Sequence, residues 1–355
     1  MSNTIEQFAR EVMSGQRRGL TTSLLRAALW SAQWPYRSGV ACKNFLFDFG
    51  LRQPFEPGVP VISVGNLTTG GTGKTPVVAF LANWFRDAGV KVGLLSRGYK
   101  SLDGQGNDEK LVLDQLCPSV PHWLNSDRVQ SAKQAVQDAG CELLILDDAF
   151  QHRRIQRDLD IVLIDALNPW GYAHCLPRGL LREPISAVER ADLVLITRAD
   201  LVHAEELTAI RTELVKHQHV ATVAELSFQP MSLVNCDGET RSLIDVVGKR
   251  CVGFCGIGNP ASFEQTLKRL GANVVDFVAF PDHHHFTNAD IRQLADLAKS
   301  LSADMLLVTQ KDLVKLHCIE IGERPCWAVT IGSKVLRGDQ VIEHHLWKLM
   351  NRCKK

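Results

Sequence analysis

The chain has 355 residues, 45% of them hydrophobic, and a formal net charge of +1. This length and composition exclude a disordered chain and predict two domains or one enlarged α/β domain. The near-neutral charge, without a basic stripe interleaved with aromatic residues, argues against nucleic-acid binding. Ten scattered cysteines form no C-x-x-C pair, which is typical of reduced cytosolic thiols and not of a disulfide scaffold or zinc site.

Residues 1–52 differ from the rest of the chain in their charge and apolar content. They carry seven Arg or Lys residues against three Asp or Glu residues, and residues 20–51 are rich in Leu, Ala, Trp and Phe. The first eighteen residues lack the apolar stretch of a secretory signal, and the longest later uncharged run, 27–36, is about half a membrane span. We therefore expect a helical segment that does not cross a bilayer. Its aromatic and basic residues fit an anionic membrane surface and the protein's own core equally well.

The segment VGNLTTGGTGKTP, residues 64–76, predicts a variant phosphate-binding loop. It lies between an apolar, β-branched run at 59–64 and a helical pattern at 75–88. A strict G-x-x-x-x-G-K-[ST] motif would have Gly where this chain has Thr68. Glycines at 70, 71 and 73 would let backbone N–H groups converge on phosphate oxygens at the helix start. In such a loop Lys74 would reach the β- and γ-phosphates and Thr75 would bind Mg²⁺.

Strands and helices alternate along the rest of the chain. The pattern predicts strands at 91–96, 142–146, 161–164 and 193–196 and a helix at 126–139, then strands at 252–254, 274–280 and 305–308 and helices at 261–270 and 288–301. We predict an α/β fold, a doubly wound, mostly parallel sheet like that of P-loop NTPases, with a second, smaller α/β portion. The predicted divisions are 1–52, 53–230 and 231–355.

An acidic pair follows the predicted strand at 142–146. Asp147 and Asp148 have the form of a Walker B motif, whose carboxylates hold Mg²⁺ directly or through water. An Asp at a strand end is often only a cap or turn residue, but the upstream phosphate loop favours the Walker B interpretation. A polar cluster that contains Gln151 and His152 comes next, where a loop would leave the sheet.

Two further polar stretches are candidates for chemistry. Asp108 and Glu109 lie in a predicted glycine-containing loop, and three histidines at 283–285 follow a predicted strand. Consecutive histidines do not readily converge on one ion, and no cysteine or spaced carboxylates join them, so we discount a structural zinc. A histidine that orients a catalytic carboxylate is the better chemical use.

The motifs together resemble the tetraacyldisaccharide 4′-kinase family, the lipid A 4′-kinases of Gram-negative bacteria. The resemblance implies transfer of the γ-phosphate of ATP, with Mg²⁺, to the 4′-hydroxyl of a tetraacylated glucosamine disaccharide 1-phosphate, giving lipid IVA. It implies the lipid A precursor and the membrane surface as partners, at the cytoplasmic face of the inner membrane, with no nucleic acid or obligate protein partner. It rests on the phosphate loop and, in one order within residues 20–345, on SRGY (96–99), DE (108–109), LDDAFQHRR (146–154), LPRGLLREP (176–184), TRAD (197–200) and FPDHHHFT (280–287).

The resemblance also implies residue roles. Asp108 would accept the hydroxyl proton with His283 as its partner. The family's acidic motif usually reads G-D-E-P, so Asn107 and Lys110 put the loop shape there in doubt, and Ala149 stands where the Walker B motif usually has Gly. Asp148, Arg182 and Glu183 would line the catalytic site, Thr75, Asp147 and Asp148 would hold Mg²⁺, and the nucleotide would contact Thr68, Thr69, Gly70, Gly71, Thr72, Gly73, Lys74, Thr75, Gln151 and His152.

Two alternatives come from other classes of protein. A regulatory GTPase or metallochaperone would read a base with TRAD (197–200) or TQKD (309–312), both of which follow apolar strands. A membrane-associated ATP-binding adaptor would leave Asp108 and His283 without a task. The acceptor of the phosphate, an alcohol or water, separates these alternatives from a kinase.

Overall fold

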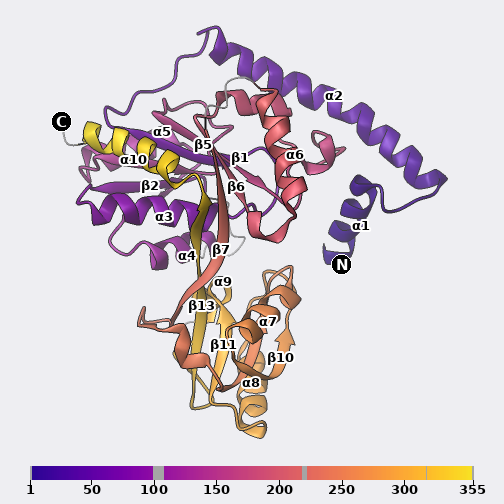
Figure 1. Cartoon of the computed structure of the whole chain (residues 1–355), viewed down its shortest axis with the longest axis vertical. Helices are drawn as coiled ribbons and strands as arrows, with labels where there is room; N and C mark the ends of the chain where they lie inside the picture. The colour runs from indigo at the N-terminus through magenta and orange to yellow at the C-terminus, as the bar shows by residue number, and fades with distance from the viewer. Residues whose placement is uncertain (1, 99–107, 218–221, 317, 354–355) are drawn as a thin grey trace. The chain divides into compact units, whose positions relative to one another are not determined.

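The computed structural model describes residues 2–98, 108–217, 222–316 and 318–353 (Figure 1). The chain forms two compact units, which we call unit 1 (residues 1–100, 117–228 and 333–355) and unit 2 (residues 101–116 and 229–332). This division differs from the predicted boundaries in three places, because residues 1–52 belong to unit 1, residues 101–116 join unit 2 and residues 333–355 return to unit 1. Membership of a unit depends on contacts between distant segments, which local sequence patterns do not reveal.

Unit 1 contains a parallel sheet with the strand order β7-β6-β5-β1-β4-β2-β3. Strands β1, β2, β4 and β6 are buried along their whole length. Burial on both faces explains their nearly continuous apolar sequences. The strands are β1 (Val61–Asn66), β2 (Val92–Ser96), β3 (His122–Leu124), β4 (Leu143–Asp147), β5 (Leu159–Asp165), β6 (Leu193–Thr197) and β7 (Val223–Val234), the last of which continues into unit 2.

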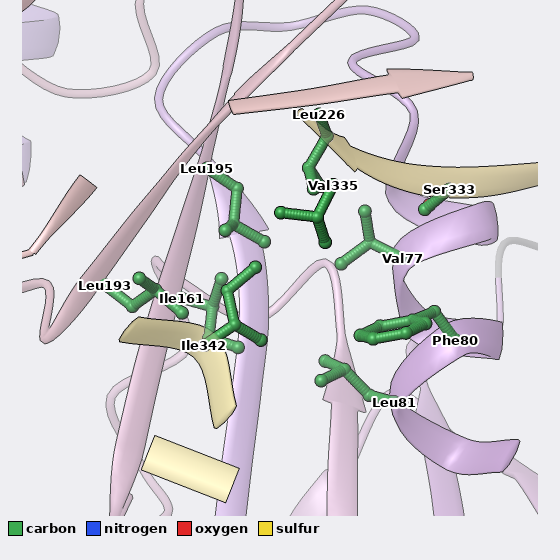
Figure 2. A pocket seen from close by; sticks show the side chains of 10 residues that line it. All are labelled: Val77, Phe80, Leu81, Ile161, Leu193, Leu195, Leu226, Ser333, Val335 and Ile342. Atoms are coloured by element: carbon green, nitrogen blue, oxygen red, sulfur yellow. The ribbon is translucent and has the colours of Figure 1, made fainter. Parts of the chain in front are cut away.

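The helices of unit 1 complete its core. An apolar pocket marks where α3, the sheet and α10 meet, and its lining side chains come from all three (Figure 2). The C-terminal helix therefore belongs to the core of unit 1. The helices are α1 (Ser2–Ser14), α2 (Leu20–Asp48), α3 (Lys74–Asp87), α5 (Arg128–Gln137), α6 (Ala204–Val215) and α10 (Asp339–Cys353), with 3-10 turns at Gly171–Ala173, Ile185–Arg190 and Ala199–Leu201.

Unit 2 contains the parallel strand order β10-β9-β11-β13. Alternate residues of β9 enter two separate apolar clusters, Val252 and Phe254 in one, Cys251 and Cys255 in the other, as expected of a strand covered on both faces. Its elements are β8 (Thr240–Arg241), β9 (Arg250–Cys255), β10 (Asn273–Ala279), β11 (Met305–Thr309), β12 (Glu320–Ile321), β13 (Arg324–Arg337, which ends in unit 1), α4 (Asp108–Leu116), α7 (Pro260–Arg269), α8 (Asn288–Ser300), α9 (Gln310–Leu316) and a 3-10 turn at Leu243–Val246.

The predicted strands and helices are confirmed in type, and their ends differ by no more than a few residues. One local prediction is wrong, because Asp108 is the first residue of α4 and not part of a loop. Val112 and Leu113 are the buried residues of this short helix, and α4 packs on α9 of unit 2, which outweighs the polar start. Tyr99 of the SRGY motif and Asn107 lie outside the described residues. All ten cysteines are free thiols.

Candidate active site

The phosphate-loop residues turn from the end of β1 into the start of α3. Gly70 and Gly73 have φ values of 120° and 83°, which L residues rarely adopt, so glycine is needed at both positions. Thr68 is buried and forms an isolated antiparallel bridge with Leu181. Glycine is not required there because the left-handed conformations fall later in the loop. The loop thus presents the N-terminus of α3, with Lys74 as its first residue, as an anion site.

The TRAD motif braces this loop from the end of β6. The Thr197 hydroxyl donates to the carbonyl oxygen of Thr72 (2.9 Å), and the Arg198 guanidinium donates to that of Gly71 (2.8 Å). Arg198 also forms an ion pair with Asp165 at the end of β5. These contacts hold the carbonyl oxygens of Gly71 and Thr72, while the backbone N–H groups of Thr69 and Thr72 donate to the carbonyl oxygens of Leu180 (2.7 Å) and Gly70 (3.1 Å). The loop is thereby held in place before the N-terminus of α3, where a phosphate would bind. The sequence pattern suggested base reading for TRAD and did not reveal this bracing.

Asp148 lies between two cations. Its Oδ1 atom is 3.4 Å from Lys74 Nζ, and Arg182 donates to both of its carboxylate oxygens at 2.8 and 2.9 Å. Burial raises the pKa of Asp148, but the charges of Lys74 and Arg182 outweigh that effect and lower the pKa below its usual value. The left-handed backbone also falls on Asp148 (φ 48°), one residue before Ala149. The Gly-to-Ala departure at 149 therefore does not distort the motif.

Asp147 ends β4 beside Asp148. The Ser96 hydroxyl donates to Asp147 Oδ2 (3.3 Å), and buried Arg128 donates to the backbone oxygens of Asp147 (2.7 Å) and Asp148 (3.2 Å). Burial lowers the pKa of Arg128, and the two carboxylates partly offset this. Arg128 thus fixes the backbone of the Walker B pair, a role that no sequence motif indicated. The carboxylates of the pair and the Thr75 hydroxyl are hard oxygen donors of the kind that Mg²⁺ prefers.

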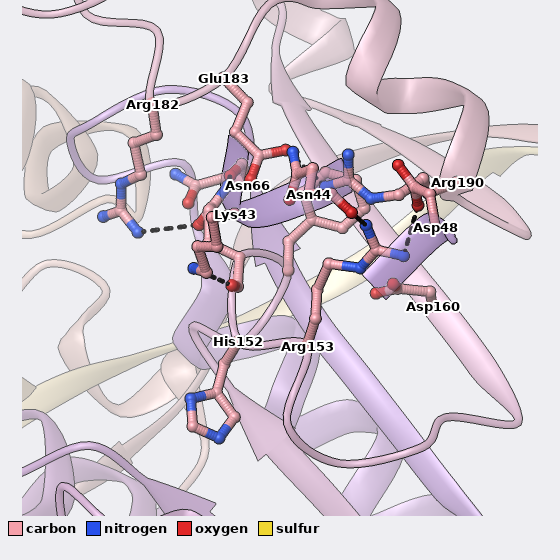
Figure 3. A network of polar contacts seen from close by, with 12 residues as sticks. Lys43, Asn44, Asp48, Asn66, His152, Arg153, Asp160, Arg182, Glu183 and Arg190 are labelled. Atoms are coloured by element: carbon pink, nitrogen blue, oxygen red, sulfur yellow. Dashed lines mark hydrogen bonds and ion pairs between the residues drawn. The ribbon is translucent and has the colours of Figure 1, made fainter. Parts of the chain in front are cut away.

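Gln151 and His152 follow the acidic pair and differ in their surroundings. Gln151 Nε2 donates to the Asn66 carbonyl oxygen (2.9 Å), and its Oε1 accepts from Arg182 (3.5 Å). Gln151 is therefore joined to the end of β1 and to the cation that holds Asp148. Burial and the charges of nearby arginines lower the pKa of His152 to about 3, so this imidazole is neutral near pH 7 (Figure 3).

Glu183 binds a different partner from its neighbour Arg182, which contacts Asp148 of the acidic pair. Its side chain is buried and forms an ion pair with Arg190, whose guanidinium carbon lies 4.5 Å from the centre of the Phe150 ring (Figure 3). The pair ties the LPRGLLREP segment to the strand-end segment after β4. The catalytic role of Glu183 remains a prediction, since its described ion pair is with Arg190.

Unit 2 brings Asp108 and His283 together. Asp108 Oδ2 is 3.5 Å from His283 Nδ1 and 3.2 Å from Lys315 Nζ. His283 has φ of 57° and its backbone N–H donates to the Gly256 carbonyl oxygen (3.0 Å), which fixes its position after β10. The next histidine, His284, instead contacts Asp290 of α8 (3.0 Å). The histidines thus have separate partners, and the predicted Asp108–His283 pair is formed.

The structure has the features of a P-loop NTPase fold: a glycine-rich loop before a helix, an acidic strand end beside the lysine of that loop, and a parallel sheet. The family model described as tetraacyldisaccharide-1-P 4′-kinase matches residues 25–351. The chain belongs to this family, as its motifs predicted.

Relatives and a solved structure agree with this membership. Tetraacyldisaccharide 4′-kinases of Syntrophus aciditrophicus and Anaeromyxobacter dehalogenans are each 36% identical to this chain, and the matches cover 89% and 92% of it and 90% and 92% of the relatives. The crystal structure of LpxK from Aquifex aeolicus in complex with ATP is similar to this chain, with a TM-score of 0.74 and 28% identity, covering 92% of this chain and 99% of that one. The predicted α/β fold and enzyme class are confirmed.

Proposed function

We propose that this chain transfers the γ-phosphate of ATP to the 4′-hydroxyl of tetraacyldisaccharide 1-phosphate, giving the 1,4′-bisphosphate of lipid A biosynthesis. Membership of the kinase family over residues 25–351 supports the reaction, and the relative solved with ATP supports the donor. The observation that carries the proposal is the position of Asp148, which lies between Lys74, the first residue of α3, and Arg182. Two cations and a carboxylate beside a helix N-terminus are the kinds of group that a nucleotide's phosphates and Mg²⁺ need, which supports the proposal.

Phosphoryl transfer asks the protein mainly for positioning and charge neutralisation. Lys74 would bind the transferred phosphoryl group, and Arg182 keeps Asp148 ionised and oriented. The Thr75 hydroxyl and the carboxylates of Asp147 and Asp148 would hold Mg²⁺, which supplies positive charge to the phosphate oxygens when bound. In unit 2 Asp108 would accept the proton of the 4′-hydroxyl while His283 orients it.

A labelled-phosphate assay tests the reaction. Purified protein with γ-labelled ATP, Mg²⁺ and tetraacyldisaccharide 1-phosphate in detergent micelles is expected to place the label on the lipid, and an acceptor that lacks the 4′-hydroxyl is expected to stay unlabelled. GTP in place of ATP tests the GTPase alternative. Label found only in inorganic phosphate, with either nucleotide, would show a hydrolase and contradict the proposal.

Membrane association through α2 is a further part of the proposal. A four-chain lipid leaves a bilayer reluctantly, at about 0.8 kcal/mol per buried CH₂, so the enzyme has to work at the surface. Trp30 and Trp34 of α2 are each 48% exposed, and the Arg37 guanidinium lies 4.9 Å from the Trp34 ring centre. Within the described residues no helix is both long and apolar enough to span a membrane. We propose a peripheral protein at the cytoplasmic face of the inner membrane.

Other residues of α2 pack on the active-site motifs. The Tyr36 hydroxyl donates to the Arg182 carbonyl oxygen (2.9 Å), and Lys43 donates to that of Gln151 (2.8 Å). Arg153 binds the last part of α2 through Asp48 (2.7 Å), as Figure 3 shows. Core packing and membrane binding are therefore compatible within this segment. One set of its side chains packs on the rest of unit 1, while Trp30 and Trp34 are exposed.

Replacing both exposed tryptophans, Trp30→Ser with Trp34→Ser, is expected to weaken binding to anionic vesicles by about tenfold or more, because each indole buries apolar area at a surface. Sedimentation with vesicles at low and high salt measures this, and salt is expected to weaken binding of the parent chain. Trp347→Ser, an exposed tryptophan of α10, is the matched control. Unchanged vesicle binding in the double variant would contradict the membrane role. Deletion of residues 1–51 is less informative because it also removes Tyr36 and Lys43.

A further inference from the structure

Lys315 of α9 is a buried lysine in contact with Asp108. Its side chain is only 8% exposed, and its Nζ atom lies 3.2 Å from Asp108 Oδ2 and 3.4 Å from Asp312 Oδ1. Taking an ammonium group out of water is costly unless carboxylates compensate it. The described contacts supply two such carboxylates. Lys315 is therefore held in one place by its charge partners and not by solvent.

Asp312 anchors this lysine in the unit 2 sheet. The Asp312 side chain is fully buried, and its Oδ2 atom accepts from the Gly256 N–H (2.9 Å) and the Thr309 hydroxyl (2.6 Å). The carbonyl oxygen of Gly256 accepts the backbone N–H of His283 (3.0 Å). Gly256, directly after β9, thus positions both Asp312, which contacts Lys315, and His283, which contacts Asp108.

The two partners of Asp108 differ in how firmly they can hold it. His283 is 74% exposed and 3.5 Å away, and an exposed contact of this kind fixes a carboxylate weakly. Lys315 is closer to Asp108 and its side chain is buried. Its other carboxylate partner, Asp312, also accepts two hydrogen bonds of its own. Among the described residues, Asp108 pairs with His283 after β10 and with Lys315 of α9, and Lys315 also contacts Asp312 of α9.

We propose that Lys315 is a positioning residue for phosphoryl transfer, which holds the Asp108 carboxylate in place and turned toward His283. Lys315 acts through Asp108 and does not touch the substrate. Its place, three residues beyond TQKD, fits no phosphate-binding or base-reading motif, so the sequence did not indicate this role. The inference rests on the proposed function only for its kinetic test, since the contact itself belongs to unit 2 alone.

The first test is the pH dependence of kcat in Lys315→Met. Removing a positive charge beside Asp108 makes protonation of the Asp108–His283 pair easier. We expect kcat at pH 7 to fall about tenfold or more, with KM for ATP within about twofold, and the acid limb of the profile to move to higher pH by about one unit. Lys315→Arg keeps the charge and is expected to keep the acid limb in place. Lys299→Met, an exposed lysine of α8, is the matched control.

A second measurement is independent of kinase activity. The NMR titration midpoint of the His283 imidazole in the free protein is expected to move to higher pH in Lys315→Met and to stay in place in Lys299→Met, because a nearby cation disfavours protonated histidine. If the His283 midpoint shifts in Lys315→Met but the parent chain labels no lipid, the proposed function is contradicted while the effect of the Lys315 charge on His283 still stands. Two outcomes would overturn the role of Lys315. In one, folded Lys315→Met shifts neither the His283 midpoint nor the acid limb of the kcat profile. In the other, Lys315→Arg and Lys315→Met shift them equally.

Discussion

Lys74→Ala is expected to lower kcat by about 10²–10³-fold while the chain stays folded, because it removes a fixed positive charge from the site of developing phosphoryl charge. The structure supports a folded variant, since Asp148 keeps both hydrogen bonds from Arg182 after Lys74 is lost. Burial of an unpaired carboxylate is thereby avoided. The loop itself depends on Gly70 and Gly73 for its shape and not on the lysine.

Initial rates with labelled ATP and the lipid acceptor measure this loss, and thermal melting checks the fold. Lys91→Ala is the matched control, because Lys91 is exposed in unit 1 just before β2. Its turnover is expected to equal that of the parent chain. Full turnover in Lys74→Ala would remove the phosphate-loop interpretation altogether.

Asp108→Ala and His283→Ala are each expected to lower kcat by about 10²–10⁴-fold, the usual range for lost acid–base catalysis, with a much smaller rise in KM for ATP. The pair acts as one unit in the proposed reaction. The double variant is therefore expected to be only slightly slower than the slower single variant, since effects of groups that work together do not multiply.

A two-by-two kinetic cycle with melting temperatures separates this pair from a structural contact. His285→Ala, an exposed histidine of the same run, is the control and is expected to keep most of its activity. Losses that multiply across the cycle, or a fully active His283→Ala, would break the Asp108–His283 pair. Asp147 or Asp148 would then be the better candidate for the base.

The unit boundaries illustrate what lay beyond sequence analysis. A change of pattern near residue 230 predicted a second α/β portion, and the boundary within β7 falls close to it. The return of β13 and α10 to unit 1, and the membership of α4 in unit 2, depend on which apolar faces meet in the folded chain. Asp108 was placed in a loop for the same reason, because α4 packs on α9, which is distant in the sequence, and buries Val112 and Leu113.

The sequence by itself determined the phosphate loop, the Walker B acids and the α/β class, because each rests on local chemistry. A strand, a turn that needs left-handed glycines at 70 and 73, and a helix that starts at Lys74 are neighbours in the chain, so their pattern is readable there. Tertiary structure alone decided several contacts between charged groups that no motif indicated. These contacts are the ion pairs Arg182–Asp148, Arg190–Glu183 and Lys315–Asp108. These partly buried contacts depend on how the chain packs, because two charged groups meet away from water only where packing brings both of them there.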